Sequence, residues 1–337
     1  MLTLTIVLLT AVIVSSIVFE YINGFHDSAN AIAAVVSTKV LSPRTAVLYS
    51  AVLNFVGALL GVHVAKTIGS GIIEGSTITL QVIFCALLAA IIWNLITWWF
   101  GLPSSSSHAL IGGLIGAAFV HAGAGSIHFG ILIKKVIIPM FASPVAGFAV
   151  GFIVMASFLW IFCRMRPDRV NRKFRKVQIL ASGLVALSHG MNDAQKTMGI
   201  ITMALVTCGI VTMAPGEFYV PIYVKIVCAL TMALGTMSGG WKIIHTMGKK
   251  IIKLKPINGA AADFSSASII LTASFFGIPL STTHIVSTVI MGVGSTVKAH
   301  AVKWGVVGNI ITAWVLTIPC CVLIAAMAYS LLKLLPH

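Results

Sequence analysis

Charged residues are scarce in this chain: Asp, Glu, Lys and Arg make up 9% of its 337 residues, and only seven residues are acidic. Soluble domains carry about 25% charged residues. This deficit excludes an ordinary soluble domain, and the 58% apolar content indicates an integral membrane protein. Apolar runs of about 18 residues or more recur, which predicts membrane-spanning helices, because the strands of a membrane barrel are short and alternate in polarity.

Three further features are missing. The first apolar run, residues 2–19, has no basic residue before it and no small-x-small cleavage site after it, which favours a retained helix over a removable signal peptide. The six cysteines form no CxxC pair, so we interpret them as small apolar core residues and expect neither metal ligands nor disulfides. The net charge of +15 lies in short loops between apolar runs, which argues against binding to nucleic acid.

Two motifs occur twice, in the same order. FGLPSSSSH at 100–108 matches FGIPLSTTH at 276–284 with an offset of 176, and NGFHDSAN at 23–30 matches HGMNDAQK at 189–196 with an offset of 166. A weaker pair aligns Pro144 with Pro319. Ordered matches of this kind indicate an internal duplication of most of the chain.

The duplication predicts an all-α membrane protein with two halves, residues 1–163 and 177–337, joined by a basic linker at 164–176. Seven basic residues place this linker in the cytoplasm by the positive-inside rule. Five crossings in each half would invert the halves relative to each other and put both termini outside. The lysine counts support this inversion. Residues 242–255 carry five lysines and the equivalent residues 66–79 carry one, as expected if the two segments lie on opposite sides of the membrane.

The ten expected crossings differ in length. The fourth and ninth are short for a full span and could instead be re-entrant Ser/Thr hairpins, whereas the first and sixth are too long for one straight helix. We therefore expect broken helices, with breaks at Gly24 and Gly190. The expected spans are residues 5–38, 46–65, 80–100, 105–121, 137–163, 177–212, 222–241, 258–278, 282–297 and 304–332.

Two acids, Asp27 and Asp193, lie at equivalent repeat positions within apolar segments. A carboxylate inside a membrane costs about 2.5–3.5 kcal/mol on insertion scales, so it normally faces a partner or a cavity. Each could cap a half-helix or pair with Lys196, but hard oxygen ligands favour a site for a coupling Na⁺ or proton over a zinc site. The candidate cation-site residues are Asp27, Asn30, Asn192, Asp193, Gln195 and Asp263, with Asp27, Asn30 and Asp193 as the candidate sodium ligands; Asp263 is not duplicated and could simply cap its helix.

The hydroxyl-rich repeats point to an anion site. A helix cannot continue through Gly-Leu-Pro or Gly-Ile-Pro, and the Ser and Thr residues that follow are favoured N-caps of a new helix. Two such N-termini, inverted across the membrane, could hold one oxyanion from both sides, although Ser and Thr also cap and pack helices without a ligand. A serine-hydrolase triad needs one activated serine beside a histidine base, so it would not explain why the Ser, His and Asp residues are all duplicated. The candidate anion ligands are Ser104, Ser105, Ser106, Ser107, Ser281, Thr282, Thr283 and Lys196, and His26, His108 and His284 could relay protons or make structural hydrogen bonds.

Four segments, GFHDSANAIA, SHGMNDAQKTMG, WNLITWWFGLPSSSSH and FFGIPLSTTHIV, resemble the signature segments of the PiT family of inorganic phosphate transporters, in particular its bacterial low-affinity branch. The resemblance extends over nearly the whole chain, and it aligns Asp263 with an acid of the family. Three positions differ from many members: His26 and Lys196 stand where asparagine is common, and Ile83 stands where the family has an acid. The Gln-Lys pattern at 195–196 is similar to that of proton-coupled carriers that take phosphate as a neutral complex with a divalent metal.

The resemblance implies a multi-pass inner (plasma) membrane carrier that imports phosphate together with a coupling cation, most simply a proton, and needs no cofactor. Alternatives within the family are coupling to Na⁺ and transport of sulfate. Alternatives from other classes are a membrane channel, a phosphate sensor and an intramembrane hydrolase. The expected partners are phosphate, the coupling cation and the lipid bilayer, and self-association into a homo-oligomer stays open.

Overall fold

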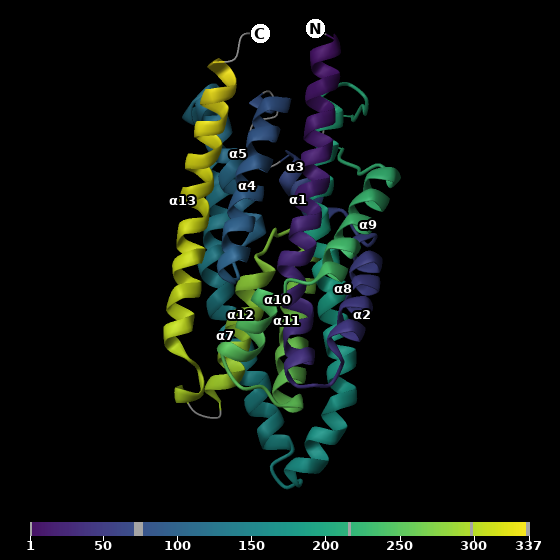
Figure 1. The fold of residues 1–337 in the computed structure, drawn as a ribbon, viewed down its shortest axis with the longest axis vertical. Helices are drawn as coiled ribbons and strands as arrows, with labels where there is room; N and C mark the ends of the chain where they lie inside the picture. The colour runs from purple at the N-terminus through teal and green to yellow at the C-terminus, as the bar shows by residue number, and fades with distance from the viewer. Residues whose placement is uncertain (1, 71–76, 215–216, 297–298, 335–337) are drawn as a thin grey trace.

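The computed structural model describes residues 2–70, 77–214, 217–296 and 299–334, and every regular element in these ranges is a helix (Figure 1). The prediction of an all-α chain is confirmed. Position 297, at the end of one expected span, lies outside the described residues. The helices are α1 (Leu2–Ser37), α2 (Pro43–Ala58), α3 (His63–Ser70), α4 (Leu80–Phe100), α5 (Ser106–Ala122), α6 (Phe129–Leu132), α7 (Ile138–Ile161), α8 (Pro167–Thr207), α9 (Ile222–Ser238), α10 (Trp241–His245), α11 (Pro256–Phe275), α12 (Thr282–Ser295) and α13 (Trp304–Leu334).

Four of the described helices are long and apolar enough to cross a membrane: Thr5–Ser37, Leu80–Phe100, Phe129–Ile161 and Trp304–Leu334. Two bent pairs raise the number to six if each pair is one crossing. They are Pro43–Ala58 with His63–Gly69, bent by 70°, and Ile222–Ser238 with Trp241–Lys250, bent by 60°. These bends lie in equivalent parts of the two halves. A total of ten crossings stays a prediction.

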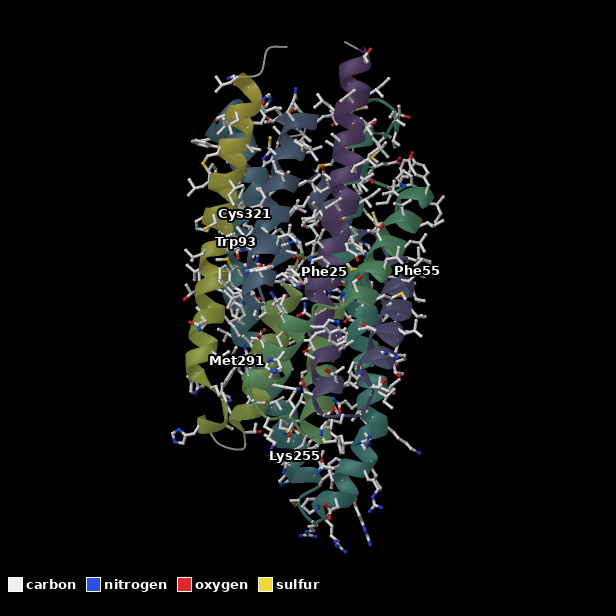
Figure 2. All side chains as sticks on the ribbon, viewed as in Figure 1. Phe25, Phe55, Trp93, Lys255, Met291 and Cys321 are labelled. Atoms are coloured by element: carbon white, nitrogen blue, oxygen red, sulfur yellow. The ribbon has the colours of Figure 1, made fainter. Side chains whose placement is uncertain are left out.

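Both termini lie at one end of the molecule, and the turn between α7 and α8 lies at the other (Figure 1). As a result, α1 runs away from the termini and α8 runs towards them. Side chains that end in nitrogen gather at the α7–α8 end (Figure 2). The basic segment at 164–176 is mostly helical, because α8 already begins at Pro167. Proline at the first helical position, followed by Asp168 in the first turn, favours this start.

Helices from the two halves pack on each other in matching pairs. The helix α1 packs on α9 and its counterpart α8 packs on α2, while α5 packs on α13 and its counterpart α12 packs on α7. The hairpin of α4 and α5 likewise matches the hairpin of α11 and α12. The pattern of contacts therefore maps onto itself when the halves are exchanged, as an internal duplication requires.

The expected breaks at Gly24 and Gly190 are wrong, because α1 and α8 continue through both positions. These glycines instead allow two helix pairs to cross closely. A Cβ atom at Gly24 would lie 2.6 Å from the carbonyl oxygen of Met232 in α9, and one at Gly190 would overlap the backbone of Asn54 in α2. Because the helices are continuous, no backbone carbonyl is freed at these positions to bind a cation.

This role of Gly190 predicts that alanine has opposite effects at two helical glycines. We expect Gly190→Ala to lower the free energy of unfolding by about 1–3 kcal/mol, because the backbone of α2 must move. Gly305→Ala should be neutral or stabilising by up to about 1 kcal/mol, because a Cβ there meets no atom within 4 Å. Thermal unfolding of the two purified variants checks this, and equal melting temperatures would contradict the close crossing.

Candidate functional site

Two equivalent turns start the helices α5 and α12 inside the protein. Each turn follows a glycine with a left-handed backbone, Gly101 at φ 65° and Gly277 at φ 62°, a conformation that other residues rarely adopt. The Oγ atom of Ser105 then accepts a hydrogen bond from the backbone N–H of His108 at 3.2 Å. Ser281 caps α12 in the same way through the N–H of His284 at 3.3 Å. The prediction that new helices start at the hydroxyl repeats is confirmed.

The starts of α5 and α12 meet at the centre of the molecule. The rings of His108 and His284 pack edge to face with their centroids 4.9 Å apart. The hydroxyl of Ser107 donates to the carbonyl oxygen of Leu280, across the two halves, at 3.1 Å. The positive ends of two helices therefore face one region, and such ends favour negative charge.

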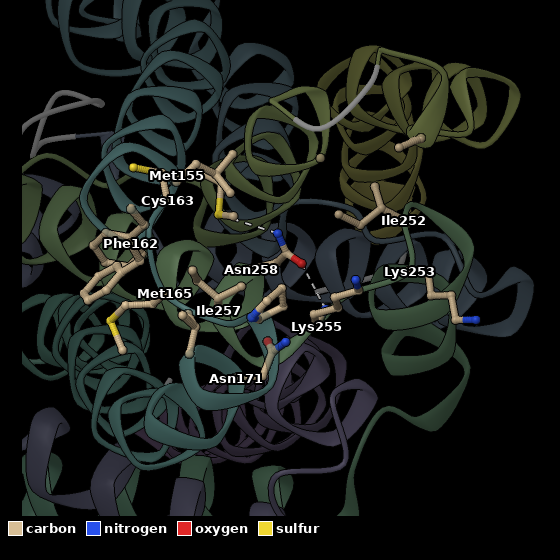
Figure 3. A pocket seen from close by; sticks show the side chains of 16 residues that line it. Met155, Phe162, Cys163, Met165, Asn171, Ile252, Lys253, Lys255, Ile257 and Asn258 are labelled. Atoms are coloured by element: carbon tan, nitrogen blue, oxygen red, sulfur yellow. Dashed lines mark hydrogen bonds between the residues drawn. The ribbon is translucent and has the colours of Figure 1, made fainter.

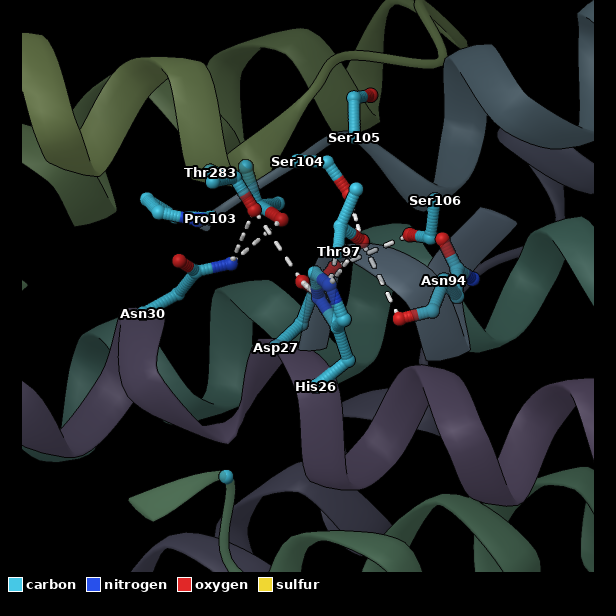
Figure 4. Close-up of polar contacts among 12 residues, drawn as sticks. His26, Asp27, Asn30, Asn94, Thr97, Pro103, Ser104, Ser105, Ser106 and Thr283 are labelled. Atoms are coloured by element: carbon cyan, nitrogen blue, oxygen red, sulfur yellow. Dashed lines mark hydrogen bonds and ion pairs between the residues drawn. The ribbon is translucent and has the colours of Figure 1, made fainter. Parts of the chain in front are cut away.

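Asp27 of α1 connects the hydroxyls of both repeats (Figure 4). Ser106 donates to its Oδ2 at 3.0 Å, and Thr283 donates to its Oδ1 at 3.2 Å. The Nδ1 atom of His26 lies 2.8 Å from the same Oδ1. One turn further along, the Asn30 amide donates to Thr283 at 3.1 Å and likewise to its neighbour Thr282. The structure thus brings one predicted carboxylate against both predicted hydroxyl segments.

Asp193 of α8 makes the corresponding contacts. Thr282 donates to its Oδ2 at 3.0 Å, and the Lys196 ammonium donates to its Oδ1. Lys196 also lies 3.4 Å from the carbonyl oxygen of Leu280. Asp193 and Lys196 are 0% and 1% exposed, so each would be a costly isolated charge if the other were absent.

Asp27, His189 and Asp193 offer ligand atoms that all lie within 4.8 Å of one another. Carboxylate and imidazole groups together suit a divalent cation. The Nε2 atom of His189 is 3.1 Å from Oδ2 of Asp193. The sequence candidates omitted His189, although it begins the repeated motif and lies one helical turn before Asp193.

Besides the Asp27 carboxylate, His26 has two hydroxyl groups as neighbours. Its Nε2 atom lies 3.1 Å from Oγ1 of Thr97 and 3.4 Å from Oγ of Ser104, and these two hydroxyls are 2.8 Å apart (Figure 4). Thr97 was not predicted as a site residue, because it lies in the apolar helix α4, before the hydroxyl repeat. Ser104, His26 and Asp27 therefore form one hydrogen-bonded group.

Sequence comparison decides the family to which this site belongs. A family model described as "Phosphate transporter family" matches residues 23–325. The chain belongs to the phosphate transporter family. A protein of Rhizobium meliloti (strain 1021), named "Probable low-affinity inorganic phosphate transporter", is 47% identical over 97% of both chains. A protein of Bacillus subtilis (strain 168) with the same name is 45% identical over 98% of both chains.

The overall structure agrees with this family. A solved structure entitled "The sodium-dependent phosphate transporter" superposes on this transporter with a TM-score of 0.89, with 25% sequence identity, over 98% of this chain and 100% of that chain. The family and these relatives are transporters and not enzymes, so the hydrolase alternative is set aside.

Three residues of the predicted cation site lie outside the central group of this transporter. The Oε1 atom of Gln195 accepts from the backbone N–H groups of Val64 and Ala65 at 2.9 and 3.2 Å, and its amide donates to Leu60, so Gln195 holds the bend between α2 and α3. Asn192 donates to Ser274 of α11 at 2.9 Å. Asp263 is buried at the eighth residue of α11, beyond the first turn, so it does not cap that helix.

The contacts of Gln195 predict a structural phenotype for its loss. Replacement by leucine leaves two backbone N–H groups at the start of α3 without their acceptor, at about 1–3 kcal/mol for each buried group. We expect Gln195→Leu to lower the melting temperature while folded protein keeps the cation-to-phosphate ratio of the parent. Unchanged stability together with an altered ratio would instead make Gln195 a cation ligand.

A cavity of about 530 Å³ lies apart from this site, between the ends of α7, α8 and α11 (Figure 3). Apolar side chains such as Met155 and Phe162 form much of its wall, together with Lys253, Lys255 and Asn258. None of the predicted site residues lines it. The central hydrogen-bonded group, and not this cavity, carries the functional assignment.

Proposed function

We propose that this transporter imports inorganic phosphate by symport with protons. The observation that carries the proposal is the charge of the central group. Asp27, Asp193 and Lys196 are each at most 2% exposed and together carry one net negative charge when ionised. Phosphate adds one or two more negative charges, and like charges 4 Å apart repel by about 4 kcal/mol at an effective dielectric constant of 20. Phosphate can therefore enter only if cations enter with it.

The anion ligands proposed from the sequence are Ser104, Ser105, Ser106, Ser107, Ser281, Thr282, Thr283 and Lys196. Among them, Ser106 and Thr283 link anion binding to cation binding. Each hydroxyl has one hydrogen, and both hydrogens now point to Asp27. To donate to phosphate instead, these hydroxyls must leave the carboxylate, which then needs a proton or a metal ion as its new partner. This exchange of partners would make the two ligands bind together.

Two features favour protons over sodium as the coupling ion. The Lys196 ammonium already occupies one oxygen of Asp193, where a bound sodium ion would otherwise balance the charge. The imidazole of His26 contacts Asp27 and can pass a proton to it. Sodium coupling stays the alternative, because the structural relative is entitled a sodium-dependent phosphate transporter.

A second part of the site supports a proposal about the form in which phosphate is carried. Asp27, His189 and Asp193 can together bind one divalent cation beside the hydroxyls. A divalent metal bound to phosphate as cargo would neutralise the anion before it enters the membrane. We therefore propose that the transporter accepts phosphate as its neutral complex with a divalent metal.

The architecture supports alternating access. The two long helices α1 and α8 run in opposite directions (Figure 1), which is consistent with two inverted halves that rock around the central site. The basic α7–α8 end would face the cytoplasm of a plasma-membrane protein and both termini would lie outside.

Uptake of radiolabelled phosphate by purified protein in proteoliposomes tests the function. We expect an inward proton gradient to drive accumulation without Na⁺, Mg²⁺ to increase it, and excess sulfate to leave it unchanged. Accumulation that requires a sodium gradient would overturn proton coupling, and competition by sulfate would indicate a sulfate permease. Flux that never exceeds equilibration would indicate a channel.

A further inference from the structure

A fourth buried acid lies inside the helix bundle, on the same helix as Asp27. Glu20 precedes Asp27 by two turns of α1 and is 0% exposed. Its Oε2 atom accepts a hydrogen bond from Thr197 of α8, whereas its Oε1 atom has no hydrogen-bond partner among the described residues. An ionisable side chain buried in a membrane protein marks a functional position by default, because its burial is costly. Neither the anion site nor the cation site above uses Glu20.

The surroundings of Glu20 suit its protonated form. The charged groups that face it are Lys196 and Asp193 of α8, and these two already neutralise each other; from α9 it is faced by the thiol of Cys228. With no net charge close by to balance it, an ionised carboxylate at this buried position would be costly, and protonation removes that cost.

Asn23 can complete the hydrogen bonding of a neutral Glu20. It lies three residues along α1, on the same helix face, and its amide lies beside the Glu20 carboxyl without another hydrogen-bond partner among the described residues. A proton on Oε1 makes this atom a donor, and Oδ1 of Asn23 is the acceptor within reach. The same amide can instead donate through Nδ2 to the ionised carboxylate, so Asn23 can be a partner of Glu20 both with and without its proton.

We propose that Glu20 is a proton-binding site, separate from Asp27 and Asp193, that carries one proton through the membrane with each phosphate. The proposal rests on the proton-coupled import proposed above. Thr197 directly follows Lys196, so the same turn of α8 contacts both the central site and Glu20. When α1 and α8 separate, the Thr197 bond breaks and water reaches the carboxyl. The O–H bond then releases its proton to that water and leaves a hydrated carboxylate.

The accumulation ratio of phosphate at equilibrium tests this proposal independently of transport rate. In Na⁺-free proteoliposomes with a clamped membrane potential, each co-transported proton multiplies that ratio about tenfold per unit of inward pH gradient. We expect Glu20→Gln to accumulate about tenfold less phosphate than the parent at one pH unit, while it still exchanges labelled for unlabelled phosphate at equal pH. Glu20→Asp, which keeps a carboxyl group, should restore the parental ratio, and a parental ratio in Glu20→Gln would overturn the proposal.

Two controls keep the result interpretable. Asp168→Asn removes an exposed acid from the same helix as Thr197 and should leave the ratio unchanged. If Glu20→Gln fails to exchange phosphate, infrared spectra of the purified parent and variant show whether Glu20 holds a proton. The parent should then have a protonated carboxylic acid band that the variant lacks. Absence of that difference overturns the proposal. Failure of the proposed function looks different, since the parent itself would then show no accumulation driven by a proton gradient.

Discussion

A Lys196→Gln variant should lose phosphate transport and also unfold more readily than the parent. Lys196 is 1% exposed and bonds to Asp193, so its removal leaves an unpaired buried carboxylate, which costs about 3–5 kcal/mol. The variant also lacks the only ammonium group that contacts the central site in the described part of the chain. We expect uptake in proteoliposomes to fall by about 100-fold or more, the equivalent of about 3 kcal/mol.

A double variant separates the two roles of Lys196. Lys196→Gln combined with Asp193→Asn removes both charges, so its melting temperature should return towards that of the parent. Transport should stay low, because phosphate still lacks its cationic partner. If the double variant transports phosphate normally, Lys196 serves only to neutralise Asp193 and the proposed contact with phosphate is wrong.

An Asp27→Asn variant should lose proton-driven accumulation of phosphate. An asparagine amide cannot take up a proton, and it lacks the negative charge with which a carboxylate attracts a metal ion. The Ser106 and Thr283 hydroxyls therefore lose the titratable partner on which the proposed coupling depends. The same holds for Asp193→Asn at the equivalent position. We expect the accumulation ratio under a proton gradient to fall to the background value measured in vesicles without protein.

The matched control is again Asp168→Asn, because this acid is exposed at the start of α8 and contacts no predicted site residue in the described structure. It should accumulate phosphate as the parent does. Undiminished accumulation in both Asp27→Asn and Asp193→Asn would show that neither carboxylate couples transport to protons.

Local chemistry made part of this site predictable from the sequence. Glycine followed by proline and then hydroxyl residues specifies a helix end and a new N-cap without help from distant residues, and the structure has these features at Gly101 and Ser105 and again at Gly277 and Ser281. The duplication then predicted that both hydroxyl segments would face one central site, and in the structure Ser106 and Thr283 both contact Asp27.

Features that depend on packing between distant helices were not predictable in this way. Glycine at 24 and 190 was interpreted as a helix break, but its role is set by the α9 and α2 backbones that cross there. Gln195 is a predicted cation-site residue of the repeated motif, but in the structure its partners are backbone groups at the bend between α2 and α3. Glu20 has no role predicted from the sequence, because only the structure shows that its carboxyl is buried against Thr197 of α8.

The most direct test of the central claim is an experimental structure of the purified protein determined in the presence of phosphate. We predict density for one tetrahedral ion between the starts of α5 and α12, within hydrogen-bonding distance of the hydroxyls of Ser106 and Thr283 and of the Lys196 ammonium. Phosphate bound in the cavity beside Lys253 and Lys255, with no ion between α5 and α12, would contradict the account.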